Sequence, residues 1–280
     1  MSGILYLVPT PIGNLGDISR RHIEILSEVD FIAAEDTRVS LKLLNHLDIR
    51  KPLVSYHRHN TETAGPAVLS RILAGETCAL VTDAGTPAVS DPGEELVALC
   101  AAQGVAVISI PGPCAAITAL AASGLPTGRF TFEGFLPVHK KNRRAHLDSL
   151  RAELRTMIFY EAPHKLRETL ADLEKTFGGT RRIALCRELT KLHEEILRTT
   201  LSDAVAHYKQ VEPKGEFVLI LEGAAPVEEE EISPALALQR VEQLRSEGLS
   251  LKQAAKQAAE ELDLPKNKLY DLALGKEVAW

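Results

Sequence analysis

The sequence predicts an α/β protein of two domains, followed by a small helical module. In the first 122 residues short apolar runs alternate with helical patterns, an order typical of a parallel sheet covered by helices. A second cycle of strands, with more polar residues, begins after SGLPTGRF (123–130). A run of four glutamates then precedes a helical tail. We therefore expect an N-terminal α/β domain over 1–122, a second α/β domain over 123–224 and a helical module over 233–280.

The strands of the first domain are predicted by apolar runs that are rich in β-branched residues or leucine and end at turns. They lie at 4–8, 29–34, 78–82 and 105–110, with helical patterns between them at about 19–28, 38–47, 62–74 and 93–103. In the second domain the strands are expected at 131–136, 156–161, 181–188 and 215–221. Their more polar character predicts some antiparallel pairing.

Three strands of the first domain run directly into turns rich in Gly and Pro. Such turns leave backbone N–H and C=O groups free to contact a small ligand, and ligands of open α/β sheets bind at the carboxyl ends of strands. The alternative is a set of tight strand–helix turns without a ligand. The turns are LYLVPTPIGNLGD (5–17), LVTDAGTPAVSDPG (80–93) and SIPGPCAA (109–116).

The first of these turns imitates a dinucleotide-binding loop, with Gly13 and Gly16 followed about twenty residues later by acidic residues. The full GxGxxG pattern is missing, however, and Pro9 and Pro11 stand where a phosphate would need free N–H groups. A ligand held by backbone and apolar contacts fits this turn better than a phosphate-rich cofactor.

The tail begins after the segment EGAAPVEEEEISP (222–234), whose like charges repel one another and are typical of a linker. Ser233 and Pro234 predict the start of a helix that runs to Gly248. Ser250 and Gln253 form a capping box for a second helix, and a third extends over 266–274. The three helices suggest either a helix-turn-helix module or a bundle docked on the main body. Charge does not decide, since residues 233–280 hold seven Lys or Arg and seven Asp or Glu.

Composition narrows the class of protein. With 45% hydrophobic and 25% charged residues among 280, the chain has the make-up of an ordinary soluble protein. Its apolar runs are too short to span a membrane, and its start lacks the basic residues of a signal peptide. Four scattered cysteines without CxxC spacing indicate a cytoplasmic chain with no disulfide and no metal site. The net charge of −6 argues against a generally basic coat but not against a local basic patch.

Polar residues follow the second predicted strand in the motif AAEDTR (33–38). Glu35 and Asp36 are expected at the ligand edge as candidate proton acceptors, with Arg38 placed to hold a carboxylate or a phosphate. In the alternative, Asp36 caps the following helix and pairs with Arg38. His57 and His59 would share one face of a strand, and Arg58 and Asn60 beside them favour a polar site.

Motifs spread along nearly the whole chain carry a more specific signal: VPTPIGNLGD (8–17), AAEDTR (33–38), SYHRHN (55–60), TDAGTPAVSDPG (82–93), IPGPCAA (110–116), FYEAPHK (159–165) and CRELTKLHEE (186–195). Together they resemble the tetrapyrrole-methylase superfamily and, within it, the branch of ribosomal small subunit methyltransferase I. The resemblance includes the C-terminal helices. It implies two α/β domains with S-adenosylmethionine (SAM) in the cleft between them, a homodimer, and methylation of the ribose 2′-oxygen of a cytidine near the decoding centre of 16S ribosomal RNA.

The resemblance also implies which residues touch the cofactor. Relatives carry GDPxxY or similar where this chain has AGTPAV, so an acidic contact is expected to move to Asp83. The other implied contacts lie in the three turns and on the second domain: Ile12, Gly85, Thr86, Val89, Cys114, Ala115, Tyr160, Glu161, Leu189 and Gly215.

The run HKKNRRAH (139–146) is the candidate for gripping RNA, because clustered cations neutralise backbone phosphates. A solvated helix start is the alternative, and the resemblance favours RNA. Few aromatic residues lie nearby, which favours recognition of shape and backbone. The RNA-binding residues expected are Lys140, Lys141, Arg143, Arg144 and His57.

Three functions remain open on the sequence. The first is ribosomal RNA 2′-O-methylation, and the second is methylation of a corrin or porphyrin precursor, which the same fold permits. The third is a SAM-binding sensor that uses the C-terminal helices on nucleic acid. The basic run, the helical tail and the AEDTR motif favour the first, and no metal is needed for it.

Overall fold

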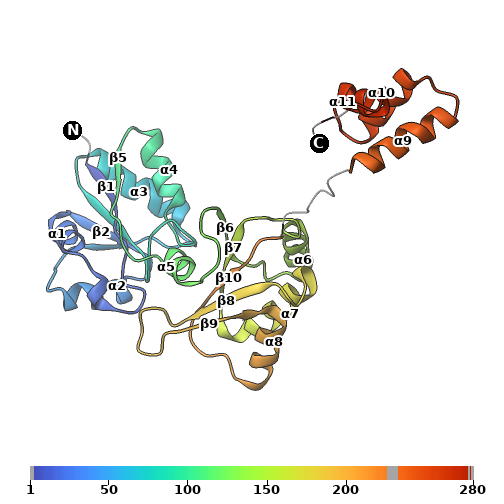
Figure 1. The fold of residues 1–280 in the computed structure, drawn as a ribbon. Helices are drawn as coiled ribbons and strands as arrows, with labels where there is room; N and C mark the ends of the chain where they lie inside the picture. The colour runs from blue at the N-terminus through green and yellow to red at the C-terminus, as the bar shows by residue number, and fades with distance from the viewer. Residues whose placement is uncertain (1–2, 226–232, 277, 279–280) are drawn as a thin grey trace. The chain divides into compact units, whose positions relative to one another are not determined.

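The computed structural model describes residues 3–225, 233–276 and 278. They form two compact units, Met1–Ala224 and Ala225–Trp280. The first unit contains two sheets and the second contains helices (Figure 1). The α/β class is confirmed, and most of segment 222–234, the expected linker, lies outside the described residues.

The first sheet is parallel throughout, with strand order β3-β2-β4-β1-β5. Apolar clusters cover both of its faces, as expected for strands buried on both sides. Its strands are β1 (Ile4–Leu7), β2 (Phe31–Ala34), β3 (Leu53–Ser55), β4 (Cys78–Val81) and β5 (Ala106–Ser109). The 3-10 turn η1 (Leu15–Asp17) follows β1, and the helices are α1 (Arg20–Glu28), α2 (Thr37–His46), α3 (Thr61–Leu73), α4 (Glu94–Ala102) and α5 (Ala115–Ala122).

The second sheet has the order β6-β7-β10-β8-β9. β6 and β7 are parallel and the other neighbours are antiparallel, which confirms the expected mixture. Its strands are β6 (Phe130–Phe135), β7 (Thr156–Glu161), β8 (Arg182–Arg187), β9 (Glu195–Thr200) and β10 (Phe217–Leu221). The remaining elements are η2 (Pro163–Lys165), α6 (Lys140–Ser149), α7 (Leu166–Phe177) and α8 (Leu201–Gln210).

One helix joins the cores of the two sheets. α5 follows β5 of the first sheet, yet its buried Ala116, Ala119 and Leu120 pack against Ile158 and Val218 of the second sheet. The opposite face of the second sheet is covered by residues of α7 and α8. The carboxyl edge of the first sheet is thereby held beside the second sheet.

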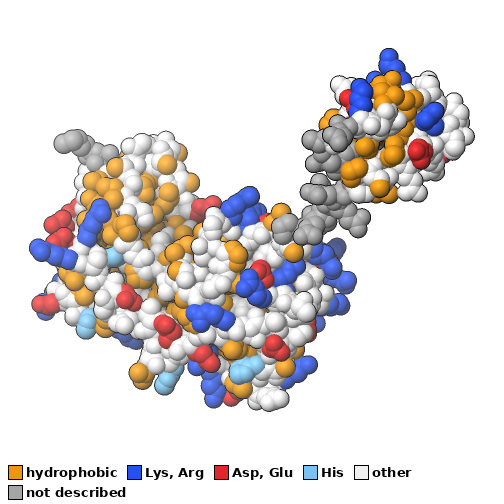
Figure 2. Space-filling model, in the orientation of Figure 1, with side chains coloured by type: hydrophobic (Ala, Val, Ile, Leu, Met, Phe, Trp, Pro, Cys, Tyr) orange, Lys and Arg blue, Asp and Glu red, His pale blue; other side chains and the backbone are white. Residues whose placement is uncertain are grey.

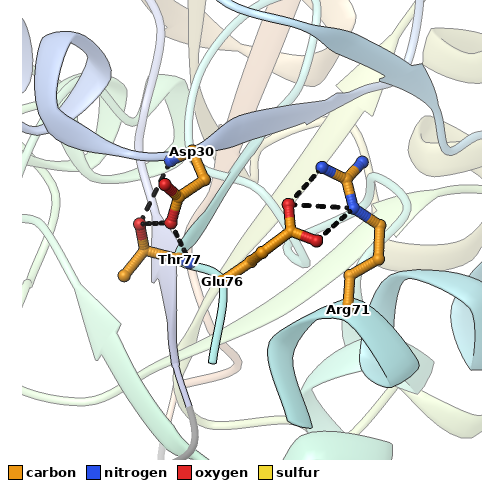
Figure 3. A network of polar contacts seen from close by, with 4 residues as sticks. All are labelled: Asp30, Arg71, Glu76 and Thr77. Atoms are coloured by element: carbon orange, nitrogen blue, oxygen red, sulfur yellow. Dashed lines mark hydrogen bonds and ion pairs between the residues drawn. The ribbon is translucent and has the colours of Figure 1, made fainter. Parts of the chain in front are cut away.

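The amino-terminal edge of the first sheet is closed by a polar network (Figure 3). The Asp30 carboxylate, just before β2, accepts hydrogen bonds from the Thr77 backbone N–H at 2.6 Å and the Thr77 hydroxyl at 2.8 Å. Next to it, Arg71 pairs with Glu76 and lies 3.5 Å above the ring of Phe31. These contacts tie β2 to β4 at the end of the sheet opposite to the Gly- and Pro-rich turns.

The described part of the second unit contains the three expected helices, α9 (Pro234–Ser246), α10 (Leu251–Glu261) and α11 (Lys266–Ala273). Ser233 caps α9 by accepting from the Leu236 N–H, and Ser250 and Gln253 form the predicted capping box. Alanines and leucines bury a small core between the helices, which includes Ala254, Ala258 and Leu269. The expected starts of the helices are therefore confirmed.

Candidate functional site

The carboxyl edge of the first sheet opens into a cavity of about 460 Å³, a size typical of small-molecule sites. The turns after β1, β2, β4 and β5 form one wall, and the ends of β6, β7 and β8 with the start of β10 form the other. The first wall contributes Ile12, Glu35, 83–86, 89–91, Cys114 and Ala115. The second contributes Phe135, 160–163, Cys186, Leu189 and 216–218. We call it the first cavity.

The turn after β4 is held in an unusual backbone conformation. Gly85 has φ of +88°, and Ala88 and Ser90, which carry side chains, both have φ of +66°. Thr10 and Gly85 exchange two backbone hydrogen bonds of 2.9 and 3.0 Å, and the Thr86 hydroxyl donates to the Pro113 carbonyl at 2.9 Å. Left-handed backbone at residues other than Gly costs about 1–3 kcal/mol and gathers at functional sites. The three turns thus brace one another around the cavity.

The start of α5 lies at the cavity with Cys114 as its N-cap. The Tyr160 hydroxyl accepts a hydrogen bond of 3.1 Å from the Ala116 N–H, so one of the free donors of this helix end is already used. The rings of Phe132 and Phe135 pack edge-on against Tyr160, with centroids 5.1 and 5.6 Å away. Tyr160 therefore connects the second sheet to the first wall.

Glu161 is buried at the cavity wall, with 4% of its surface exposed. One carboxylate oxygen accepts from the Ala162 N–H at 2.9 Å, and the other accepts from the Thr169 hydroxyl. Thr169 also accepts from the Arg143 guanidinium at 2.7 Å. Glu161 is thus held in place by a chain of hydrogen bonds that reaches α6.

Three carboxylates line the first wall: Glu35, Asp83 and Asp91. Burial, and after it the negative charges of Glu35 and Asp83, together raise the pKa of Asp91 to about 6, against the opposing effect of Arg58. Burial likewise raises the pKa of Glu35 and of Asp83. Since no Lys or Arg stands among the described lining residues, the site favours a positively charged ligand.

Asp36 and Arg38 do not line the cavity. The Asp36 carboxylate caps α2, accepting from the Arg38 N–H at 2.8 Å, and forms a 2.6 Å ion pair with the Arg38 guanidinium. These contacts hold the pKa of Asp36 well below its usual range. This is the capping arrangement weighed on the sequence, and a catalytic role for either residue stays a prediction. The Asp36 N–H donates to Asp83 at 3.1 Å, so the pair also positions a cavity carboxylate.

The interpretation of His57 and His59 as residues of a strand is wrong, because β3 ends at Ser55. Both lie in the turn that follows, where Asn60 accepts from the His57 N–H at 2.8 Å. Their rings contact one another edge to face, 6.1 Å apart. Asn60, a turn-forming residue, was the signal for this turn.

The basic run begins α6 at Lys140. Figure 2 shows several Lys and Arg side chains over the region of α6 and α7. Lys140, Lys141 and Arg144 are exposed. Arg143 is not: its side chain is 8% exposed and binds Asp172 at 2.6 Å as well as Thr169. Arg143 therefore stabilises the packing of α6 on α7, and only the other three face solvent.

The predicted cofactor contacts come together at the first cavity with the exception of Gly215. Gly215 has φ of +82°, and a Cβ there would lie 2.5 Å from the Glu188 side chain, beside the wall. Whether any of these residues touches a cofactor stays a prediction. Sequence reasoning missed Asp91, Phe135, Phe217 and Val218. Asp91 stood in the recognised motif TDAGTPAVSDPG, but nothing local indicated that it lines the cavity.

The described residues contain neither a metal-binding cluster nor a membrane-spanning helix. No group of three or more His, Cys, Asp or Glu residues is arranged to hold a metal ion. Nor is any helix in the described ranges long and apolar enough to cross a membrane. The cysteines are all free, and three of them, Cys78, Cys100 and Cys186, are buried.

Comparisons with known proteins cover the whole fold. Residues 4–205 match the model of the tetrapyrrole (corrin/porphyrin) methylases, and residues 231–277 match that of the RsmI C-terminal HTH domain. Ribosomal RNA small subunit methyltransferase I of Synechocystis sp. is 49% identical over 97% of this chain and 98% of its own length. The proteins of the same name from Halalkalibacterium halodurans and Escherichia coli O157:H7 are 50% and 48% identical over 96% and 97% of this chain, and 94% and 95% of their own lengths.

Solved structures share the fold at lower identity. Diphthine synthase superposes with a TM-score of 0.60 at 15% identity, over 79% of this chain and 90% of its own. The methyltransferase CobJ superposes with a TM-score of 0.59 at 19% identity, over 80% of this chain and 95% of its own. Uroporphyrin-III C-methyl transferase from Thermus thermophilus, complexed with S-adenosylhomocysteine, has a TM-score of 0.55 at 21% identity. The match covers 79% of this chain and 97% of that one.

Proposed function

Because the chain belongs to the tetrapyrrole methylases and, among them, to the ribosomal RNA small subunit methyltransferase I family, we propose that it methylates the ribose 2′-oxygen of a cytidine in 16S ribosomal RNA, near the decoding centre, with SAM as methyl donor. The observation that carries the proposal is full-length similarity to relatives of that name, C-terminal helices included. Methylation of a corrin or porphyrin precursor is less well supported, since such structures match only about 79% of the chain.

The first cavity fits SAM. Its small residues let a ligand approach the backbone. A Cβ at position 85 would lie 3.5 Å from the Ile12 side chain, and Gly85 leaves that space open. When bound, SAM supplies an electrophilic methyl group on a positively charged sulfonium. Glu35, Asp83 and Asp91 stabilise positive charge there by Coulomb attraction in partly buried surroundings. The proposed contacts are Ile12, Asp83, Gly85, Thr86, Val89, Cys114, Ala115, Tyr160, Glu161, Leu189 and Gly215.

This chain's part in the chemistry is alignment and proton removal. An in-line displacement gains much of its rate from holding acceptor and donor in line. A ribose hydroxyl is a weak nucleophile, so a carboxylate that accepts its proton contributes about 10²–10⁴-fold. A raised pKa makes Glu35 and Asp91 better proton acceptors than an ordinary carboxylate.

RNA binding is proposed for the exposed cations Lys140, Lys141 and Arg144, with His57 in the turn after β3. Exposed cations near one another neutralise backbone phosphates without reading sequence. The second unit, which matches a helix-turn-helix model, is a further candidate. By the same resemblance we propose a homodimer that acts in the cytoplasm on the small ribosomal subunit.

The experiment that tests the proposal is transfer of labelled methyl from SAM to small ribosomal subunits from a strain that lacks this activity, followed by digestion to nucleosides. We expect label on the ribose of a cytidine. Label on a base, or no label while calorimetry shows SAM bound, would overturn it. Corrin and porphyrin precursors are assayed in parallel.

A further inference from the structure

A second cavity, of about 450 Å³, adjoins the first. The two share Ser90, Asp91 and Phe135, which line both of them. The second cavity lies between the turns that precede α3 and α4 on one side and strand β6 on the other. Its other lining residues are Arg58, Thr61, Ala88, Pro92, Glu94, Glu95, Phe132, Glu133 and Gly134.

The lining of this second cavity combines aromatic faces with hydrogen-bonding groups. Phe132 and Phe135 remain 37% and 59% exposed although they are large and apolar. Arg58 contributes a positive charge, and its guanidinium also lies 3.4 Å from the Ser90 carbonyl. Exposed aromatic rings beside polar groups bind unstacked bases of RNA, which stack on the ring and pair through their edges.

We propose that the second cavity holds the target nucleoside, with its base against Phe135 and its ribose 2′-hydroxyl at Asp91. This inference rests on the proposed function and names the acceptor's place within it. Asp91 and Phe135 are, with Ser90, the residues that a nucleoside in the second cavity would share with a donor in the first. A cytidine in an RNA helix would have to leave its stack to enter, at a cost of a few kcal/mol.

This placement supports methyl transfer in which Asp91 accepts the proton of the hydroxyl. The 2′-hydroxyl O–H bond breaks as its proton passes to the Asp91 carboxylate. The oxygen forms a bond to the methyl carbon, and the electron pair of the breaking S–C bond stays on sulfur, leaving a neutral thioether. Asp91 faces the acidic Glu35 and Asp83 and the basic Arg58. Tyr160 of β7, which lines the first cavity with Asp91, stays protonated because burial raises its pKa to about 12.

Preference for cytidine has a place in the same cavity. The exocyclic amino group of cytosine donates to carboxylates, and uracil has a carbonyl there instead. Glu133 is engaged with His146 at 2.8 Å. Glu94 and Glu95, in the first turn of α4, are exposed, and their side chains make no hydrogen bond or ion pair within the described parts of the chain. We assign them as acceptors for that amino group.

The test uses the full chain, SAM and unmethylated small subunits, with variants Phe135→Ala and Asp91→Asn. We expect Phe135→Ala to weaken binding of subunits in the presence of S-adenosylhomocysteine by about 5–150-fold, in line with stacking of about 1–3 kcal/mol per base. Asp91→Asn should bind subunits normally and lose about 10²–10⁴-fold in methyl transfer. Phe130→Ala is the matched control, since Phe130 is 40% exposed on the same strand and lines neither cavity.

Specificity gives an independent readout. Subunits with uridine at the target position should be methylated poorly by the wild type. In the Glu94→Ala, Glu95→Ala double variant, the ratio of the methylation rate with cytidine to that with uridine should fall at least tenfold. Glu62→Ala, an exposed first-turn glutamate of α3 outside both cavities, should leave the ratio unchanged. If the wild type methylates cytidine but Phe135→Ala and the double variant behave as wild type, the nucleoside site is wrong. If the wild type transfers no methyl to subunits, the proposed function itself has failed.

Discussion

The Tyr160 hydroxyl accepts a 3.1 Å hydrogen bond from the backbone N–H of Ala116, and this bond links the second sheet to the start of α5 across the first cavity. Without the hydroxyl, the N–H at this partly buried helix end would lose its partner.

Tyr160→Phe should therefore lower the free energy of unfolding by about 1–2 kcal/mol, the cost of one unsatisfied donor. Binding of S-adenosylhomocysteine should weaken as the helix end loosens. Urea unfolding and calorimetry measure the two effects. Tyr6→Phe serves as the control, because the Tyr6 hydroxyl makes no hydrogen bond in the described structure. Equal stability of the two variants would contradict the prediction.

Gly85→Arg should abolish binding of SAM. The side chain would enter the first cavity from a backbone position with φ of +88°, next to Ile12. Gly104→Arg introduces the same side chain at a similar φ of +68°, where nothing lies within 4 Å of a Cβ. Calorimetry should show no heat of binding for the first variant and normal affinity for the second. Normal affinity for both would rule out the first cavity as the cofactor site.

Asp91 should make stability depend on pH. Because its folded pKa is about 6 and lies above the unfolded value, the folded state binds the proton more tightly, and stability falls as pH rises from about 4 to about 6. Asp91→Asn removes this loss and should be more stable than wild type at pH 8, but not at pH 4. Thermal unfolding across that range measures the difference. If the stabilities of Asp91→Asn and wild type differ by the same amount at all pH values, burial of Asp91 does not raise its pKa.

Asp30 should have the opposite pH dependence. Hydrogen bonds from Thr77 lower its pKa, so its contribution is present at neutral pH and is lost as pH falls through the folded pKa. Asp30→Asn should lower the melting temperature by a few degrees at pH 7, and the gap should close in acid. Glu28→Gln, at the exposed end of α1, is the control. The network in question is the one drawn in Figure 3.

Reversing Lys140, Lys141 and Arg144 to Glu should weaken subunit binding and reduce its salt dependence, since each phosphate contact contributes about 0.7–0.9 to the slope of log K against log salt. SAM affinity should not change. Reversing Lys42, Arg50 and Lys209, three exposed cations elsewhere, is the matched control. Arg143→Glu should instead destabilise the fold, because it removes the guanidinium that binds Asp172 and Thr169. If the variant with all three cations reversed still methylates subunits at the normal rate, the basic run is only the solvated start of α6.

Sequence reasoning found eight of the strands, the edge strands β5 and β6 among them. It missed β3, which is only three residues long, and β9 (EILRTT), whose mixed polarity gives no continuous apolar run. At the site, motifs identified the turns but not their partners. That Asp36 caps α2 while Glu35 faces the cavity follows from the direction of each side chain at the end of β2, and adjacent residues in a motif do not reveal it.

The position of α5 has a consequence for how the molecule comes apart. By sequence the helix follows the first sheet, and by packing it belongs to the core of the second, so Ala119 and Leu120 cannot leave their neighbours without pulling on the turn that holds Cys114 and Ala115. The ligand cavity therefore lies where the two sheets share packed residues, and not at a hinge between independent domains. The two sheets should melt in a single cooperative transition, and a ligand bound there should raise the temperature of the whole transition rather than protect one half.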